Sequence, residues 1–324
     1  MGAAEPFDEL RDPIPGVDNV IGELISSRSS GNVRLLHLRF REAEPELGTL
    51  VSLLAAVLVD YCLPLKQRRA ARQRDAEAGS GGGTFHVAML HGEAVRLLIR
   101  YNQSATGRYG EVGELISYLL AVHKLDAAQV ASKMTLKTSS EMAYHGADGL
   151  HAQKNDDGTI TFYFLESKLA PDANTAAAEF CKSVAKFGSD RKAKVNELRI
   201  VMNLSNLDAL EGKAREEAMS YFDSYSTGSA SLKRRERHVG SLVYTEKAYA
   251  KRLPIDDTKP IDIHEKNFVA NYAPMQAKHE ATVLRQAAAN GVSLGECIVF
   301  LFAIPSIADL KKAFAEANGG HVRR

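Results

Sequence analysis

Two strand-like runs separated by a polar turn stand out in the middle of the chain. Residues 159–169 are rich in β-branched and aromatic types, which favours a strand. The turn before them contains Asp157-Gly158, a pair typical of β-hairpins. A hairpin folded about Asp157 places Asp148 opposite Glu166. The pattern therefore predicts two antiparallel strands that each carry an acidic residue.

The direction of the side chains on this hairpin suggests its chemistry. Successive strand residues point to opposite faces, so Glu166 and Lys168 share a face, and Asp148 is expected beside them. Neighbouring carboxylates repel each other unless a cation lies between them, and Mg²⁺ prefers oxygen ligands together with water and phosphate. Such an ion activates water, while a nearby lysine offsets developing negative charge. The three residues together are typical of phosphodiester hydrolysis.

Helical and strand-like patterns alternate along the rest of the chain. Apolar residues at three- and four-residue spacing predict helices at 46–63, 85–101, 109–123, 172–187, 208–222, 268–289 with a break at Pro274, and 306–317. A shorter helix is expected near residues 21–25. Strands are expected at 33–40, 133–138, 198–204, 239–244 and 297–303. This order predicts an α/β fold in which helices flank a mixed central sheet.

A glycine-rich run suggests where the chain divides. Residues 78–83 contain Gly-Ser-Gly-Gly-Gly, which is typical of a flexible loop. We expect this loop to separate an N-terminal α/β subdomain, residues 1–83, from a catalytic domain with a C-terminal extension, residues 84–324. The N-terminal subdomain is a candidate for partner contact. No Lys-Ser or Lys-Thr follows the glycines, which excludes a phosphate-binding P-loop.

Further candidates for the site lie upstream of the hairpin and beside Asp148. Glu111 and Glu114 are three residues apart, so they lie on one side of the helix expected at 109–123. Glu114 is our first choice for a metal ligand and Glu111 is the alternative, whereas in a purely structural role both favour the helix N-terminus. His145 and His151 flank Asp148 and are candidates for contact with substrate or metal.

Composition narrows the class of protein. The chain has 324 residues, of which 45% are hydrophobic and 25% charged, which suits one large or two modest cores. The longest apolar stretch, residues 50–59, is too short to span a bilayer, and no signal peptide is recognised. An odd number of cysteines without metal-type spacing argues against disulfides and zinc; they are Cys62, Cys181 and Cys297. These features predict a cytoplasmic protein.

Charge gives only a local indication of nucleic-acid binding. The formal net charge of +1 produces no global positive field. Basic runs at residues 66–74, 191–194 and 233–237 are candidates for phosphate contacts. For any one run, a solvated charged face is the competing interpretation.

Asp148 and the Glu166-Ser167-Lys168 segment resemble the motif of the PD-(D/E)xK nuclease superfamily. Ala147 stands where the superfamily pattern has proline. The order Gly-Glu-x-Gly-Glu-Leu from Gly110, then Gly-Ala-Asp-Gly, then Glu-Ser-Lys more narrowly resembles the HamA family, nuclease subunits of the bacterial Hachiman anti-phage defence system. The resemblance is firmest over residues 108–187.

This resemblance implies a restriction-endonuclease-like core, DNA as the substrate, and Mg²⁺, or alternatively Mn²⁺, as the cofactor. It implies that Asp148, Glu166 and Glu114 hold the metal and that Lys168 orients the attacking water and offsets charge. It also implies a heterodimer with a superfamily 2 helicase subunit similar to HamB.

Two competing functions and a second copy of the motif limit this interpretation. Glu211-Gly212-Lys213 repeats the Glu-x-Lys pattern in a polar, helix-like stretch, where a solvated surface is expected. One alternative function is a catalytically inactive, nuclease-like module that binds DNA or a partner. The other is a glycoside hydrolase that uses the Asp148 and Glu166 carboxylates. The absence of tryptophan from the chain argues against a sugar-binding platform.

Overall fold

A computed structural model gives the structure of the chain and describes residues 7–24, 31–78, 83–104, 110–132, 147–190, 206–227, 234–256 and 258–319. The strands within these ranges are β1 (Ile21–Leu24), β2 (Val33–Leu38), β3 (Phe40–Arg41), β4 (Glu44–Pro45), β5 (Ala128–Ala131), β6 (Gly149–Lys154), β7 (Ile160–Ala170), β8 (Arg234–Thr245) and β9 (Cys297–Ile304). A mixed seven-stranded sheet has the order β1-β2-β9-β8-β7-β6-β5, and β3 and β4 form a separate pair. The predicted α/β class is confirmed.

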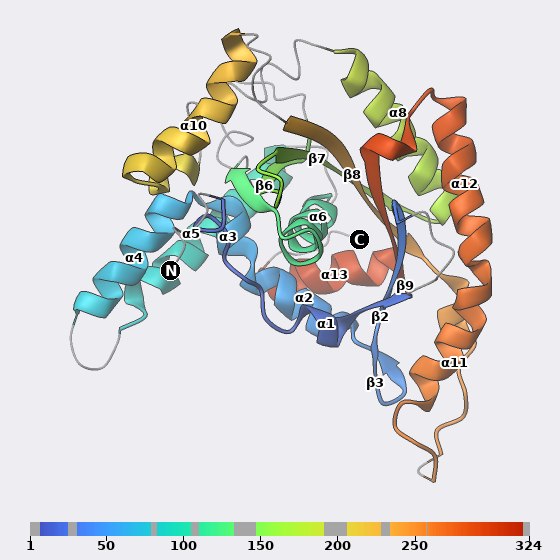
Figure 1. Cartoon of the computed structure of the whole chain (residues 1–324). Coiled ribbons are helices and arrows are strands. Elements are labelled where there is room, and N and C mark those ends of the chain that lie inside the picture. Colours follow the sequence, from blue (N-terminus) through green and yellow to red (C-terminus); the bar gives the residue numbers. More distant parts are fainter. Residues whose placement is uncertain are drawn as a thin grey trace. The chain divides into compact units, whose positions relative to one another are not determined.

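Helices pack around this sheet (Figure 1). The α-helices are α1 (Val17–Val20), α2 (Leu47–Ala56), α3 (Leu58–Cys62), α4 (Leu65–Glu77), α5 (Phe85–Ser104), α6 (Glu111–Lys124), α8 (Ala173–Ser189), α10 (Gly212–Thr227), α11 (Ile263–Tyr272), α12 (Gln276–Ala289) and α13 (Ile307–Ala317). Short 3₁₀ helices are η1 (Asn206–Ala209), η2 (Lys247–Ala250), η3 (Ala273–Met275) and η4 (Leu294–Glu296). Among the described helices, none is long and apolar enough to cross a membrane.

The chain packs as two compact units, each described separately below. Unit 1 comprises Met1–Ile14, Ala56–Leu165 and Ser189–Arg237. Unit 2 comprises Pro15–Ala55, Glu166–Gly188 and His238–Arg324. Strands β7 and β8 contribute residues to both units. The functional boundary expected after residue 83 stays a prediction.

Strand β9 forms the core of unit 2. All its residues are buried, and it runs parallel to both β2 and β8, with Leu301 opposite Leu35 and Leu242. A strand covered on both faces needs a continuous apolar run rather than an alternating one, which is what its sequence provides. Helices α11 and α12 follow one another across η3, where Pro274 interrupts the helical pattern as predicted (Figure 1).

The prediction of a helix near residues 21–25 is wrong, because strand β1 occupies Ile21–Leu24. β1 pairs antiparallel with β2, with Ile21 opposite Leu38. Gly22 permits this pairing, because a Cβ there would lie 2.4 Å from Cε1 of His37. Arg34 adds a charged hydrogen bond across the pair, with its Nε 2.6 Å from Glu23 Oε1. Strand pairing therefore overrides the local helical spacing.

Unit 1 is built from helices packed on the hairpin of β6 and β7 and on β5. Helix α6 contacts both β5 and β6, and its apolar residues are buried, as in Leu115 and Leu119. Helices α4 and α5 lie side by side (Figure 1). The buried Asp75 of α4 accepts hydrogen bonds from the backbone N–H groups of His86 and Val87, each at 2.9 Å. It thereby satisfies donors at the start of α5 that lack partners within that helix.

Other predicted elements differ in extent. The helix expected at 46–63 is divided into α2 and α3, and the one expected at 208–222 becomes η1 followed by α10. Strand β5 at Ala128–Ala131 was not predicted. The strands expected at 133–138 and 198–204 lie outside the described residues. All three cysteines are buried, and none of them is in a disulfide.

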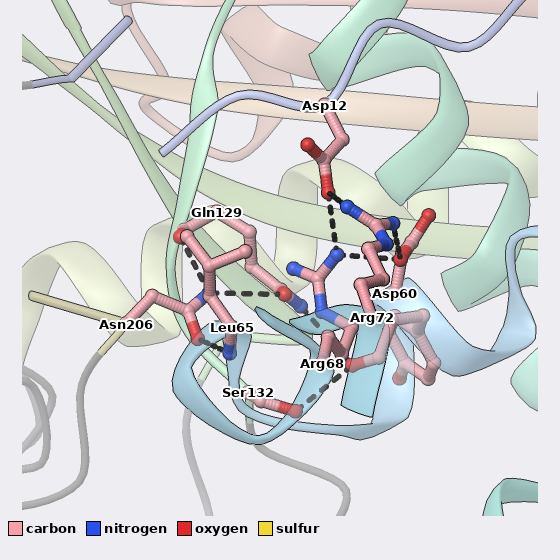
Figure 2. Close-up of polar contacts among 9 residues, drawn as sticks. Asp12, Asp60, Leu65, Arg68, Arg72, Gln129, Ser132 and Asn206 are labelled. Carbon is pink, nitrogen blue, oxygen red and sulfur yellow. Dashed lines mark hydrogen bonds and ion pairs between the residues drawn. The ribbon is translucent and has the colours of Figure 1, made fainter. Parts of the chain in front are cut away.

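A buried ion network joins α4 to α3 and to the segment before α1 (Figure 2). Arg68 is 3% exposed, and its Nη1 lies 2.8 Å from Asp12 Oδ2 and 2.5 Å from Asp60 Oδ1. Arg72 also pairs with both aspartates. Burial raises the pKa of the Asp60 carboxyl, although the charge of Arg68 opposes this rise.

Asn206 connects the start of α4 to strand β5 (Figure 2). It is 1% exposed. Its Oδ1 accepts from Leu65 N at 2.9 Å, and its Nδ2 donates to Gln129 O at 2.8 Å. Leu65 N is one of the first amides of α4 and has no acceptor within the helix. One side chain therefore satisfies a helix terminus and a strand carbonyl together.

We expect Asn206→Ala to lower the free energy of unfolding by about 1–3 kcal/mol, because it leaves two buried backbone groups without a partner. Urea denaturation followed by circular dichroism measures this loss. Asn174→Ala is the matched control, because the exposed Asn174 accepts hydrogen bonds only at the surface, from Arg285 and Gln286. The control should change stability by less than about 0.5 kcal/mol. Equal effects of the two variants would contradict this role of Asn206.

Glu265 ties α11 to strands β2 and β3 in unit 2. Its carboxylate accepts from His37 Nε2 at 3.3 Å, Arg39 Nη1 at 3.1 Å and the backbone N–H of Phe40 at 3.4 Å. Burial alone would raise the pKa of Glu265, but the hydrogen bonds from His37 and Phe40 and the neighbouring positive charges outweigh it. The pKa therefore lies below its ordinary value of 4.5.

This lowered pKa predicts how the stability of the chain depends on pH. The unfolded chain binds a proton at Glu265 more readily than the folded one, so the contribution is complete above pH 4.5 and is lost as pH falls through the folded pKa. Glu265→Gln should lower the free energy of unfolding by about 1–3 kcal/mol at pH 7. The stability of this variant should also fall less steeply than that of the wild type as the pH drops below 4.5. Unfolding curves at several pH values test this, with the exposed Glu316→Gln as control. An unchanged acid profile for Glu265→Gln would refute it.

Candidate functional site

The hairpin of β6 and β7 has the predicted register. Gly149 lies opposite Leu165 and Leu150 opposite Phe164, as a fold about Asp157 requires. Asp148 N donates to Leu165 O at 2.8 Å, so the ladder continues one residue beyond β6. The backbone of Asp148 therefore lies beside the residue that immediately precedes Glu166 in β7.

Glu166 and Lys168 share one face of β7. Lys168 Nζ lies 2.6 Å from Glu166 Oε1, and the two side chains are 21% and 19% exposed, respectively. The expectation from the period of two along a strand is confirmed. Both side chains therefore remain partly accessible to solvent.

Glu114 and Asp148 line one small cavity in unit 1. Its volume is about 10 Å³. The other residues of its wall are Tyr61, Ser117, Tyr118, Gln129, Ala131, Gly149, His151 and Leu165. Glu111, the alternative to Glu114, is 2% exposed and is absent from this wall. The position of Glu114 one turn into α6 thus brings its carboxylate to the same space as Asp148.

Tyr61, near the end of α3, donates a hydrogen bond from its hydroxyl to Glu114 Oε2. Burial raises the pKa of Tyr61 well above its ordinary value of 10.0, and the negative charge of Glu114, the hydrogen bond to it and the charges of Cys62 and Asp148 raise it further. The phenol therefore stays protonated at neutral pH. Tyr61 is a neutral donor in a wall that carries two acids.

The cavity has room for a single small species. About 10–15 Å³ is the space that one water-sized species needs. Carboxylate oxygens such as those of Glu114 and Asp148 are preferred ligands of Mg²⁺, which commonly uses only one or two protein carboxylates and fills its remaining positions with water and substrate. Across the described ranges, no group of three or more His, Cys, Asp or Glu side chains is arranged to hold a metal by itself. The acidic donors at this cavity wall are therefore two carboxylates, those of Glu114 and Asp148.

The predicted site residues fall into two pairs. Glu114 and Asp148 meet at the cavity in unit 1, whereas Glu166 and Lys168 form an ion pair in unit 2. Convergence of Glu114, Asp148 and Glu166 on one metal stays a prediction. His151 is 1% exposed in the cavity wall, and its ring lies 5.7 Å from that of Tyr118. His145 lies outside the described residues.

Tyr61 and Gln129 are cavity residues that the sequence analysis missed. Tyr61 belongs to the apolar stripe of a predicted helix, where an aromatic residue is usually part of the core. Gln129 belongs to β5, which was not predicted. The one signal that could have pointed to Tyr61 is its hydroxyl group, because the hydroxyl of a buried tyrosine usually has a hydrogen-bond partner.

The second Glu-x-Lys segment lies at the surface as expected, and Cys181 belongs to the core. Glu211 and Lys213 are exposed at the start of α10. Cys181 is fully buried in α8, and burial raises the pKa of its thiol to about 11. A thiol with this pKa is almost entirely protonated at neutral pH, so it is a poor nucleophile.

Comparison with known proteins identifies one family. The model of the HamA family matches residues 17–317, which is most of the chain. No curated protein matches the chain.

Proposed function

Because the chain belongs to the HamA family and so is a component of Hachiman defence, we propose that it is a metal-dependent DNA nuclease that hydrolyses phosphodiester bonds. The observation that best supports this proposal is the hairpin register. It aligns Asp148 with the residue before Glu166, while Glu166 and Lys168 share a face of β7. The PD-(D/E)xK motif has its Asp and its Glu-x-Lys on neighbouring strands, and this hairpin carries the three residues in that order.

Each residue has a role in this proposal. Asp148 and Glu114 would hold Mg²⁺, or Mn²⁺, from the cavity side, and Glu166 would be the third acidic ligand. The chemistry that such an ion supplies is activation of water and neutralisation of charge on the phosphate. Lys168 would orient the attacking water and face the negative charge that grows on the phosphate in the transition state.

The ion pair between Lys168 and Glu166 fits these roles. Glu166 carries a negative charge that Lys168 balances at 2.6 Å. A divalent cation that binds Glu166 would take over this balance and leave the ammonium of Lys168 available for the phosphate. Both side chains keep about one-fifth of their surface exposed, so the pair lies at the edge of the solvent.

Alanine variants of the motif test the proposed activity. We expect Glu166→Ala, Lys168→Ala and Asp148→Ala each to lower the rate of DNA cleavage at least about 100-fold, because each removes charge stabilisation from the transition state. Incubation of plasmid and linear DNA with the purified protein, with Mg²⁺ or with EDTA, measures the rate.

Glu211→Ala with Lys213→Ala is the matched control, because it removes a Glu-x-Lys pair that lies at the surface. This variant should cleave at the wild-type rate. Wild-type cleavage by Glu166→Ala would overturn the assignment. DNA binding without metal-dependent cleavage by the native protein would favour the alternative, an inactive nuclease-like module.

We also propose that the chain works in a heterodimer with a superfamily 2 helicase subunit, as the family implies. The helicase would hold the nuclease inactive until it engages DNA and ATP. Co-expression of the chain with the neighbouring helicase gene should yield a complex by gel filtration, and that complex should cleave DNA only when ATP is added. Failure to recover a helicase, or equal cleavage with and without ATP, would contradict this part of the proposal.

A further inference from the structure

We infer that Tyr61 is a positioning residue that fixes the carboxylate of Glu114 for metal binding. This inference rests on the proposed function, because it assumes that Glu114 is a metal ligand. The Tyr61 hydroxyl donates to one oxygen of Glu114, Oε2. The carboxylate has a second oxygen, and both Glu114 and Asp148 border the same cavity. A donor on one oxygen restricts rotation of the carboxylate and so sets the direction of the other.

The backbone of Tyr61 is itself held in place. Its carbonyl oxygen accepts from Gln129 Nε2 at 3.2 Å and from Ser132 Oγ at 3.0 Å. Both donors are buried, and they lie in β5 and directly after it. A residue near the end of a helix has a carbonyl that lacks an intrahelical partner, so these two side chains satisfy the end of α3 as well.

Gln129 is fixed in turn by Asn206, whose Nδ2 donates to Gln129 O at 2.8 Å and lies 3.4 Å from Gln129 Oε1 (Figure 2). Figure 2 shows Asn206 between Leu65 and Gln129, with Ser132 below them. The hydrogen bonds therefore run without interruption from the start of α4 through β5 to Tyr61, and from Tyr61 to Glu114. The position of the Glu114 carboxylate on α6 therefore depends on hydrogen bonds that involve α4 and β5.

The physical reason for this arrangement is the flexibility of glutamate. A Glu side chain has three rotatable bonds, and an unrestrained carboxylate must lose this freedom when it binds a metal. A hydrogen bond that is already present restricts the carboxylate before the metal arrives. Outer hydrogen-bond partners of metal ligands typically contribute about 10–100-fold to metal affinity.

Tyr118 provides a matched control for Tyr61. It is also a buried tyrosine of the cavity wall, 3% exposed, and its ring lies 6.0 Å from that of Tyr61. Burial raises the pKa of its phenol, and the charges that act on it most are those of Asp60, Arg68, Asp12 and Arg72. Tyr118→Phe therefore removes a buried hydroxyl from the same cavity wall but keeps the hydrogen bond between Tyr61 and Glu114.

Mn²⁺ binding, followed by electron paramagnetic resonance of the free ion, tests the inference on the full chain. Tyr61→Phe keeps the ring packing, so we expect a melting temperature close to that of the wild type and Mn²⁺ affinity weakened by about 10–100-fold. Tyr118→Phe should bind Mn²⁺ as the wild type does, and Glu114→Ala should bind it at least as weakly as Tyr61→Phe. If Tyr61→Phe unfolds, Ser132→Ala, which removes one hydrogen bond to the Tyr61 carbonyl, should weaken Mn²⁺ binding to a smaller extent.

The outcomes separate this inference from the proposed function. Wild-type Mn²⁺ affinity in Tyr61→Phe, together with weak binding by Glu114→Ala, would overturn the role of Tyr61 and leave the nuclease proposal standing. Weakened binding in Tyr61→Phe, with a native protein that cleaves no DNA under any metal condition, would support the role of Tyr61 and overturn the nuclease. Absence of Mn²⁺ binding by the native protein would overturn the inference.

Discussion

The register of the β6 and β7 hairpin is the constraint on which the candidate site depends. A slip of one residue would turn Glu166 and Lys168 to the other face of the strand and would remove Asp148 from its place beside Leu165. The turn fixes the register: Asn155 N donates to Thr159 O at 2.8 Å, and Gly158 has a φ of 74°. Left-handed backbone of this kind is easily reached only by glycine.

Buried polar contacts impose a second constraint, on the helical part of unit 1. The apolar core brings α3, α4 and β5 together, but hydrophobic contact has no direction and tolerates small shifts. The hydrogen bonds of Asn206, Gln129 and Ser132 have geometric requirements. Asn206 accepts from Leu65 N at the start of α4, and Gln129 and Ser132 donate to the Tyr61 carbonyl near the end of α3. They therefore set the position of Tyr61 more sharply than packing alone.

The sequence was informative where local pattern and final environment agree. The apolar run of β9 and the turn residues around Asp157 specify their own structures, so their strands and the hairpin register could be predicted. The β1 strand at Ile21–Leu24 could not, because its partner β2 supplies the hydrogen bonds that stabilise it. Ala128–Ala131 has weak intrinsic preference for a strand and likewise depends on pairing, with β6. The role of Tyr61 depends on a contact across more than fifty residues of sequence.

The two acids at the cavity wall argue for function over stability. Carboxylates that share a small, partly buried space repel each other and lose hydration, so each costs free energy in the folded chain. Apolar side chains of similar size would fill the same space at no such cost. The Tyr61 hydroxyl offsets part of this penalty, because it donates a hydrogen bond to Glu114. Packing alone gains nothing from acids in this position, which is why the cavity is the place at which the proposed metal binding is best tested.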